Sequence, residues 1–197
     1  MDIRNEPLMM DLRTLNRTAV KDLPGYIAGG SVRRAYLGLP TDNCDIDIFL
    51  DKDKMTYGLI STIEKATGAV LSNKRRSLWE SDHPWKGPSG QTYKLQVICE
   101  WKVKSCRDLL DQFDYSASMY GMRKTGDIMR PRGRWNDRNV NWLVNKLHGY
   151  SHQALVRALK FEYQGSRLQN WHELKDFLIV ERNVEQACHI SGQDSLT

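Results

Sequence analysis

The sequence predicts an α/β (α+β) protein with a mixed sheet, flanking helices and a C-terminal helical segment. Short apolar runs typical of strands dominate the first 120 residues, with helical stretches between them. Residues 44–50 alternate in the manner of a strand with two different faces. The remainder carries apolar residues at helical spacing, so we expect a core over residues 1–133 and a helical segment over 134–197.

Each expected element has a local signal. Apolar side chains at helical spacing predict a helix over residues 5–22, and Pro24-Gly25 ends it. Gly68 stops a helix over 54–67, and Ser105 can cap a helix over 105–112. Strands are expected over residues 26–28, 44–50, 69–71, 77–79, 93–100 and 113–120, and further helices over 32–37, 139–148, 151–164 and 171–183. A loop or hairpin tip is expected over 80–90, and an irregular basic segment over 121–133.

Two carboxylates share one face of the strand over residues 44–50. Asp45 and Asp47 are two positions apart, so they project side by side with Cα atoms about 6–7 Å apart. Like charges this close repel each other unless a cation lies between them, and Mg²⁺ takes oxygen ligands that it shares with phosphates. The pair predicts a site for Mg²⁺ or Mn²⁺. The alternative is a strand with one solvated face.

A turn of two glycines and a serine comes shortly before these acids. Gly29 and Gly30 permit backbone geometry that a side chain would block. Their N–H groups, together with the start of the next helix, can form an anion site to which the Ser31 hydroxyl adds a donor. The turn therefore indicates a phosphate-binding loop, with a plain tight turn as the alternative.

The spacing between the turn and the acids resembles that of a known family. Gly30-Ser31, then thirteen residues, then Asp-Ile-Asp-Ile resembles the signature of the DNA polymerase beta-like nucleotidyltransferase superfamily. The stretch GGSVRRAYLGLPTDNCDIDIF also resembles the head of tRNA CCA-adding enzymes and bacterial poly(A) polymerases, with Arg34 where those carry the Asp of VRD. Together with LQVIC, FDYSASMYG and RALKFEYQGSRL, the chain resembles small nucleotidyltransferase-like proteins of viruses and phages. The resemblance implies a nucleotidyltransferase-type sheet.

The superfamily pattern implies a third acid on a neighbouring strand, where it completes the cation site and can act as a base. The expected position is held by Gln96, a neutral amide that can ligate a metal weakly but cannot act as a general base. Asp114 is the first candidate for the missing acid, on what should be an adjacent strand. Glu100, which should share a strand face with Gln96, is a further candidate. A buried structural role for Asp114, bonded to backbone or to an arginine, remains open.

Basic side chains supply candidate contacts to the nucleotide. Arg157 and Lys160 are three residues apart on a predicted helix and share a face, with Tyr163 three residues later. The two cations can neutralise phosphates and Tyr163 can stack on a base or ribose, so these residues join Gly29–Ser31 and Arg34 as predicted nucleotide-binding residues. The alternative for this helix is a solvated face.

A basic segment after residue 120 has an aromatic residue within it, a combination that suits a single strand or an RNA end. Its members are Arg123, Lys124, Arg130, Arg132, Arg134, Trp135 and Arg138. Charged runs of this kind are also common in solvated loops.

The composition is that of a soluble globular protein, with 40% hydrophobic and 27% charged residues. The net charge of +5 and the pI near 9.0 favour polyanionic partners. Four widely spaced cysteines without a CxxC pair suit a reducing cytosol. No signal peptide or membrane-spanning run is evident, so we expect a cytoplasmic protein without a membrane partner.

These features predict a nucleotidyltransferase that moves a nucleoside monophosphate from an NTP to a hydroxyl and releases pyrophosphate. The positive charge favours an RNA 3′ end, tRNA-like, as the acceptor. A toxin-like or antibiotic-modifying transferase acting on a protein or small molecule is one alternative. A catalytically inactive nucleotide- or nucleic-acid-binding module is another, because Gln96 replaces an acid. The sequence assigns neither a base preference nor an oligomeric state.

Overall fold

A computed structural model describes residues 6–41, 44–131, 139–141, 151–163 and 166–179. The chain divides into two compact units. The first contains Met1–Phe113 and Ala117–Gly133, and the second contains Asp114–Ser116 and Arg134–Thr197. Each unit is described by itself.

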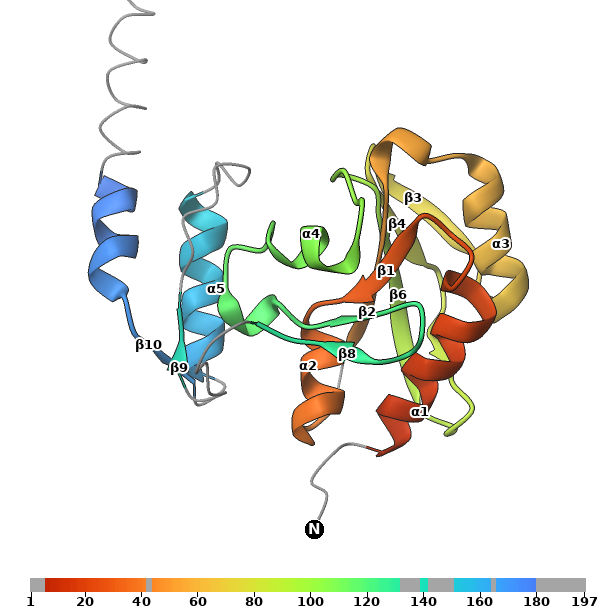
Figure 1. The fold of residues 1–197 in the computed structure, drawn as a ribbon, viewed down its shortest axis with the longest axis horizontal. Helices are drawn as coiled ribbons and strands as arrows, with labels where there is room; N and C mark the ends of the chain where they lie inside the picture. The colour runs from red at the N-terminus through yellow and green to blue at the C-terminus, as the bar shows by residue number, and fades with distance from the viewer. Residues whose placement is uncertain (1–5, 42–43, 132–138, 142–150, 164–165, 180–197) are drawn as a thin grey trace, which may run out of the picture. The chain divides into compact units, whose positions relative to one another are not determined.

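The first unit is built on a mixed eight-stranded sheet (Figure 1). Its strands run in the order β3 (Leu71–Arg75), β4 (Leu78–Ser81), β6 (Thr92–Ile98), β2 (Asp45–Leu50), β1 (Gly25–Ala28), β7 (Gly121–Met122) and β8 (Ile128–Met129), while β5 (Trp85–Lys86) pairs with β6. Strands β2 and β6 are parallel and their neighbours antiparallel. The predicted mixed sheet with flanking helices is confirmed.

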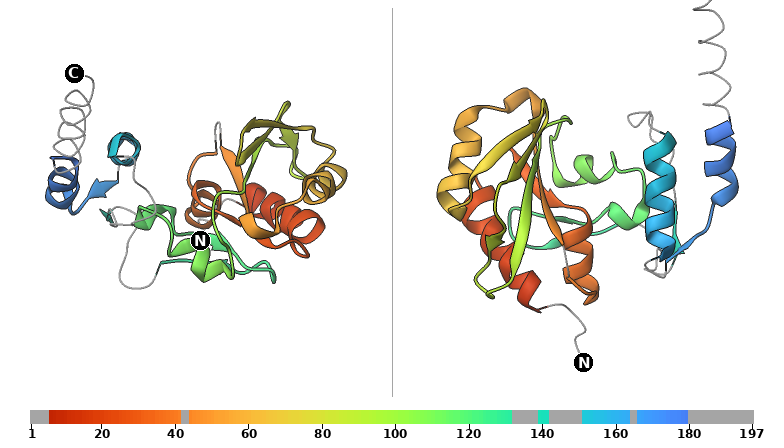
Figure 2. Two further views of the ribbon diagram at one scale, coloured as in Figure 1. Left: turned by 90° about the horizontal axis from the view of Figure 1, so that it is seen from above. Right: turned by 180° about the vertical axis from the view of Figure 1, so that it is seen from behind.

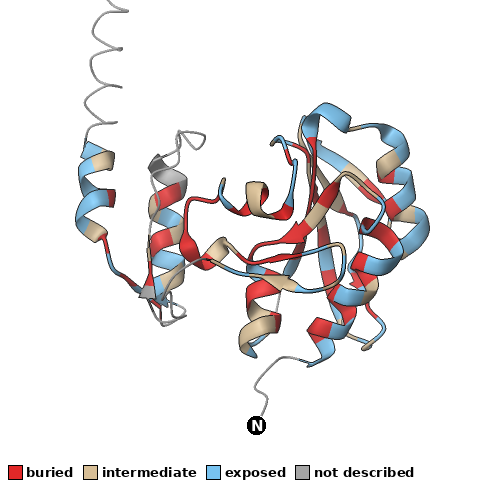
Figure 3. Ribbon diagram, in the orientation of Figure 1, coloured by how far each residue is buried: buried red, intermediate tan, exposed pale blue. Residues whose placement is uncertain are grey.

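Three helices cover one face of this sheet (Figure 2), namely α1 (Glu6–Leu15), α2 (Gly30–Leu37) and α3 (Tyr57–Thr67). They contribute Leu12, Val32 and Ile63 to a core that also contains Ile46 and Ile48 of β2. Figure 3 shows the buried residues of this unit along the strands and the inner sides of the helices. The predicted alternation in β2 is confirmed, since its apolar positions point into this core.

The opposite face carries a second, smaller core. Phe49 of β2 stacks on Trp101 with ring centroids 5.1 Å apart and meets Phe113 edge-on at 5.4 Å. Leu109 of the short helix α4 (Cys106–Leu110) packs in the same cluster. The face that carries Asp45 and Asp47 is therefore apolar and covered near Phe49.

A buried carboxylate anchors α1 to the loop between β5 and β6. Asp11 accepts a hydrogen bond from the backbone N–H of Ser89 at 2.8 Å and from the Tyr93 hydroxyl at 2.9 Å, and the Ser89 hydroxyl also donates to it. Burial and the hydrogen bond to Asp11 raise the pKa of Tyr93. This contact fixes the rotation of α1 about its own axis.

The predicted helix over residues 5–22 is helical but not uniform. After α1, the chain forms one stretch of π-helix, η1 (Asn16–Val20), in which the N–H of Lys21 donates to the carbonyl of Asn16 at 2.7 Å. That bond spans five residues instead of four, so the segment holds an extra residue per turn.

The predicted ends of two other helices are confirmed. Ser105 caps α4 by accepting a bond from the N–H of Asp108 at 3.0 Å, and Gly68 ends α3 with a φ of 70°. The short helix η2 (Lys52–Lys54) lies before α3.

Several predicted elements are wrong. Residues 113–120 form no strand: they contain a bend at Asp114, a single bridge residue and the 3₁₀ helix η3 (Ser116–Ser118). The segment expected as a loop or hairpin tip over 80–90 does connect the antiparallel strands β4 and β6, but it also contains the end of β4, with Glu80, and all of β5. The segment expected to be irregular over 121–133 contains β7 and β8. Strand β6 ends at Ile98, so Glu100 lies beyond it. The strands inside residues 80–90 and 121–133 form because they pair with distant segments, which the local pattern does not show.

The second unit contains α5 (Ser151–Tyr163), a helix over residues 171–179 and the parallel pair β9 (Asn139–Val140) and β10 (Arg167–Leu168). Because β9 is a strand, the helix predicted over 139–148 is wrong at its start, and residues 142–150 lie outside the described part. The helix predicted over 171–183 is confirmed as far as residue 179. The Tyr115 hydroxyl donates to the Ala154 carbonyl at 2.6 Å and holds Tyr115 against α5 within this unit.

Cys44, Cys99 and Cys106 are buried free thiols. Cys188 lies outside the described residues. Within the described ranges, no helix has the length and apolar character needed to cross a membrane.

Candidate active site

A row of polar side chains crosses the centre of the sheet. Asp47 of β2 pairs with Ala28 of β1 on one side and with Gln96 of β6 on the other, and Gln96 pairs with Glu80 of β4. Directly paired residues project on the same side of a sheet, so Glu80, Gln96 and Asp47 share one face. Asp45 lies on that face opposite Lys94.

The row is held by hydrogen bonds at its outer end. The Gln96 amide nitrogen donates to one Glu80 oxygen at 2.9 Å, and the Lys94 ammonium contacts the other at 2.7 Å. The bond to Glu80 raises the pKa of Lys94, and the nearby Asp45 acts in the same direction. Glu80 is thus an acid of this face that the sequence prediction missed. The stretch RRSLWES has a strand pattern that could have identified Glu80. The predicted strand ended at residue 79, however, so Glu80 was left outside it.

The register places Gln96 directly beside Asp47, where the resemblance implied an acid. Among the described residues, no three His, Cys, Asp or Glu side chains are grouped to hold a metal ion. Asp45 is exposed and Asp47 half-buried. The carboxylate pair and its neutral neighbour therefore form the centre of the site.

The glycine turn passes directly beside Asp47. Gly29 is the N-cap of α2 with a φ of 94° and a ψ of −147°, a conformation that is nearly confined to glycine. A Cβ placed on Gly29 would lie 3.2 Å from the Asp47 carboxylate. The fold thus brings together the turn and the acidic strand.

The donors of the turn are not all available. The Gly29 N–H donates to the Tyr120 carbonyl at 2.7 Å, so it cannot serve the phosphate cradle that was expected of it. Gly30 and Ser31 occupy the first turn of α2, where N–H groups have no acceptor within the helix. The Ser31 hydroxyl is buried and has no hydrogen-bond partner within the described part of the chain. An orphaned donor next to a helix start fits an anionic ligand.

We expect Gly29→Ala to lower activity at least tenfold, because the new methyl group strains the turn and crowds the Asp47 carboxylate. The measurement is the rate of pyrophosphate release. Gly90→Ala is the matched control, since Gly90 has a φ of 88° but open space around its Cβ position. Equal losses in both variants would show that backbone strain alone is responsible.

Arg34, predicted to bind nucleotide, supports the loop after α2. Its guanidinium donates to the Pro40 carbonyl at 2.6 Å, and the side chain is half-buried. This bond helps to fix the chain between α2 and the acidic strand.

Two predicted site residues meet each other in the second unit. The Arg157 guanidinium lies 3.0 Å from the Asp114 carboxylate, whose side chain is 4% exposed, while that of Arg157 is 34% exposed. Asp114 lies on a bend rather than on the predicted strand. Lys160 and Tyr163 are exposed on α5, Tyr163 to 94%. The structural alternative for Asp114, a bond to an arginine, is thus the arrangement observed in this unit.

We expect Arg157→Met to reduce the free energy of unfolding by about 2 kcal/mol, because it leaves a buried carboxylate without this cation; the exposure of the arginine limits the loss. Lys160→Met removes the same charge from the exposed part of α5 and should change stability by less than about 0.5 kcal/mol. Urea denaturation measures both. Unchanged stability of Arg157→Met with a loss of nucleotide affinity would instead favour the phosphate role.

The basic residues after position 120 do not form one uniform surface segment in the described part of the chain. The Arg130 guanidinium donates to the Tyr36 hydroxyl at 2.9 Å, and Lys124 is turned toward backbone carbonyls of the first unit. Arg132, Arg134, Trp135 and Arg138 lie outside the described residues.

No protein-family model and no curated protein matches this sequence. Solved structures do. A Thermotoga maritima CCA-adding enzyme complexed with tRNA matches with a TM-score of 0.61 and 16% identity over 93% of this chain and 47% of the other. A CCA-adding enzyme in complex with CTP matches with a TM-score of 0.59 and 16% identity over 89% of this chain and 43% of the other.

These matches are similarities of fold. At 16% identity they show that the chain folds like part of a CCA-adding enzyme, in agreement with the nucleotidyltransferase-type sheet that the sequence predicts. The chain spans less than half the length of each of these two proteins.

Proposed function

We propose that this protein is a metal-dependent nucleotidyltransferase, which moves a nucleoside monophosphate from an NTP to a hydroxyl and releases pyrophosphate. The observation that carries the proposal is the contact between the Gly29 turn and Asp47. It brings a helix start with an orphaned serine hydroxyl next to two carboxylates on one strand face. Phosphoryl chemistry needs both, since positioning and charge stabilisation provide most of its catalysis.

Asp45 and Asp47 are the residues that would hold Mg²⁺ or Mn²⁺, because paired carboxylates suit hard cations. When bound, such an ion activates the attacking oxygen and stabilises the leaving group. The N–H groups of Gly30 and Ser31 and the Ser31 hydroxyl would orient the triphosphate. Arg157, Lys160 and Tyr163 stay predictions as nucleotide contacts, and Asp114 stays a prediction as the third acid.

Glu80 is a further acid on the sheet face that carries Asp47. Gln96 lies between Glu80 and Asp47, and its amide nitrogen and Lys94 both bind the Glu80 carboxylate. Glu80 is therefore held in place, two strands away from Asp47. Its role would be to fix the orientation of Gln96 beside the metal pair, rather than to bind the ion.

RNA is the acceptor that the net charge and the similar folds favour. The net charge is +5, and one similar structure is a CCA-adding enzyme complexed with tRNA. A protein side chain or a small molecule, the acceptors of a toxin-like or antibiotic-modifying transferase, are the alternatives within the same chemistry.

The test uses purified protein with Mg²⁺ or Mn²⁺, all four NTPs and pooled RNA, and it measures pyrophosphate together with radioactive label at RNA 3′ ends. Label on RNA supports the proposal, and label on protein or a small molecule supports the other acceptors. The neutral Gln96 beside Asp47 favours a second candidate, an inactive nucleotide-binding module. Nucleotide binding without any pyrophosphate release would establish that candidate.

A further inference from the structure

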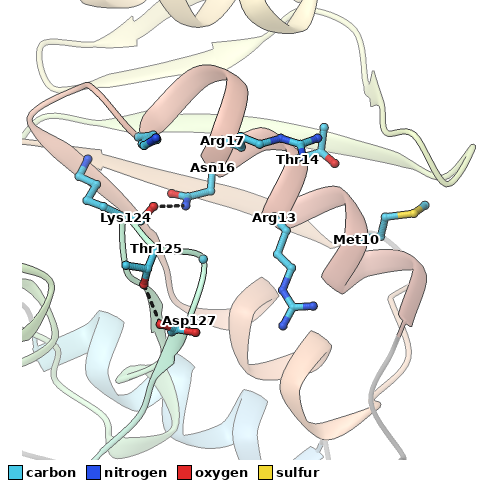
Figure 4. A pocket seen from close by; sticks show the side chains of 10 residues that line it. Met10, Arg13, Thr14, Asn16, Arg17, Lys124, Thr125 and Asp127 are labelled. Carbon is cyan, nitrogen blue, oxygen red and sulfur yellow. Dashed lines mark hydrogen bonds between the residues drawn. The ribbon is translucent and has the colours of Figure 1, made fainter.

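A pocket unconnected with the carboxylate row lies between the N-terminal helices and the turn that joins β7 to β8 (Figure 4). Arg13 of α1, Arg17 of η1 and Lys21 at its end line one side, and Asp127 lies on the other. None of these residues belongs to the proposed site of nucleotidyl transfer.

The three cations form a line. Arg13, Arg17 and Lys21 follow one another at four-residue steps, with Arg13 on α1, Arg17 on η1 and Lys21 directly after η1, and all three line this pocket. All three are exposed, and none has an ion-pair partner among the described residues. The Asp127 carboxylate accepts a hydrogen bond from Thr125 at 2.8 Å. The pocket therefore has a surplus of positive charge distributed along an axis.

Asn16 adds an unsatisfied acceptor to the pocket. It is 2% exposed, and its amide nitrogen donates to the carbonyls of Arg123 at 3.1 Å and Lys124 at 3.3 Å. Its side-chain oxygen has no hydrogen-bond partner in the described part of the chain. Asn16 is also the first residue of η1, and short π-helical segments are frequent at functional sites.

We propose that this pocket binds the sugar–phosphate backbone of single-stranded RNA. A line of cations suits successive phosphates better than one compact anion. RNA is the strand expected because this inference rests on the proposed function, in which the positive charge favours an RNA acceptor. Met10, which lines the same pocket and is 45% exposed, offers an apolar surface to a base. The site would hold an RNA strand away from the reacting end.

The test is fluorescence anisotropy of a labelled single-stranded RNA with the full chain, at salt concentrations between about 0.05 and 0.2 M. The variant Arg13→Gln/Arg17→Gln/Lys21→Gln should bind at least tenfold more weakly, and the salt slope should fall by about 2, since each phosphate contact on a single strand contributes about 0.7. Lys65→Gln/Lys86→Gln/Lys104→Gln is the matched control: it removes three exposed cations elsewhere and lowers the net charge from +5 to +2 equally. It should retain most of the affinity.

Several outcomes overturn this inference. They are failure of the wild-type protein to bind RNA, unchanged binding by the pocket variant, or equal weakening in the control. Weaker binding of ATP or pyrophosphate with unchanged RNA affinity would instead make the pocket a nucleotide site. Tighter binding of the matching DNA strand than of the RNA would contradict the assignment to RNA. RNA binding by Asp45→Asn/Asp47→Asn should be normal, so the inference can fail or succeed separately from the proposed chemistry.

Discussion

The double variant Asp45→Asn/Asp47→Asn is expected to lose at least about 10³-fold in the rate of pyrophosphate release, equivalent to about 4 kcal/mol of activation free energy. Asparagine keeps the shape of both side chains but removes the two charges that would hold the cation. Both residues project from the face of β2 beside the Gly29 turn, so no other described acid pair occupies an equivalent position.

The variant should remain folded, because it removes repulsion between neighbouring carboxylates, and urea denaturation checks this. Asp53→Asn/Asp82→Asn is the matched control, since both residues are exposed and the charge change is the same. It should retain activity. Full transfer by the Asp45→Asn/Asp47→Asn variant would refute the metal assignment, and loss in both pairs would point to an effect of net charge.

The second large effect is expected from Lys124→Met. The Lys124 ammonium donates to the carbonyls of Val20 at 2.8 Å, Leu23 at 2.6 Å and Gly25 at 2.5 Å, and it lies 4.7 Å from the centre of the Tyr26 ring. Methionine fills similar space without a donor, so three carbonyls lose this partner. At about 1 kcal/mol for each bond, the free energy of unfolding should fall by about 3 kcal/mol. Urea denaturation at pH 7 measures the change.

This effect should depend on pH. Burial lowers the pKa of Lys124 from 10.5 to about 8, so between these values the unfolded chain holds a proton that the folded chain has released. The free energy of unfolding of the wild-type protein therefore increases as pH rises from about 8 to 10.5, because Lys124 titrates over this range. The variant lacks this titrating group. The stability difference between wild type and variant should widen over that range. A constant or narrowing difference would contradict the lowered pKa.

The features that the sequence predicted are those with local causes. Alternation in residues 44–50 identified the two faces of β2, because side-chain direction in a strand depends only on position along it. The cap at Ser105 and the stop at Gly68 likewise follow from the chemistry of single residues. The closeness of Gly29 to Asp47 was also anticipated, through the spacing of a family signature rather than through periodicity.

The features that it missed depend on pairing between distant segments. Glu80 reaches Gln96 across 16 positions, and this contact exists only because β4 pairs with β6 in one register. Lys124 looked like one more cation of a basic loop, yet its carbonyl partners are about a hundred positions earlier. From the sequence, a catalytic and a structural role for Asp114 were equally plausible, because the sequence does not show that Arg157 lies beside it.

The number of residues in the π-helical stretch at Asn16–Val20 determines how α1 is rotated about its axis. Removing one residue from it would restore ordinary α-helical spacing and rotate everything before it by about 100°. Asp11 would then leave Ser89, and Leu12 would leave the core. The number of residues between Asp11 and the end of η1 at Val20 therefore cannot change by one without loss of these contacts. A chain related to this one by descent should preserve that interval even where the identities of its residues have diverged.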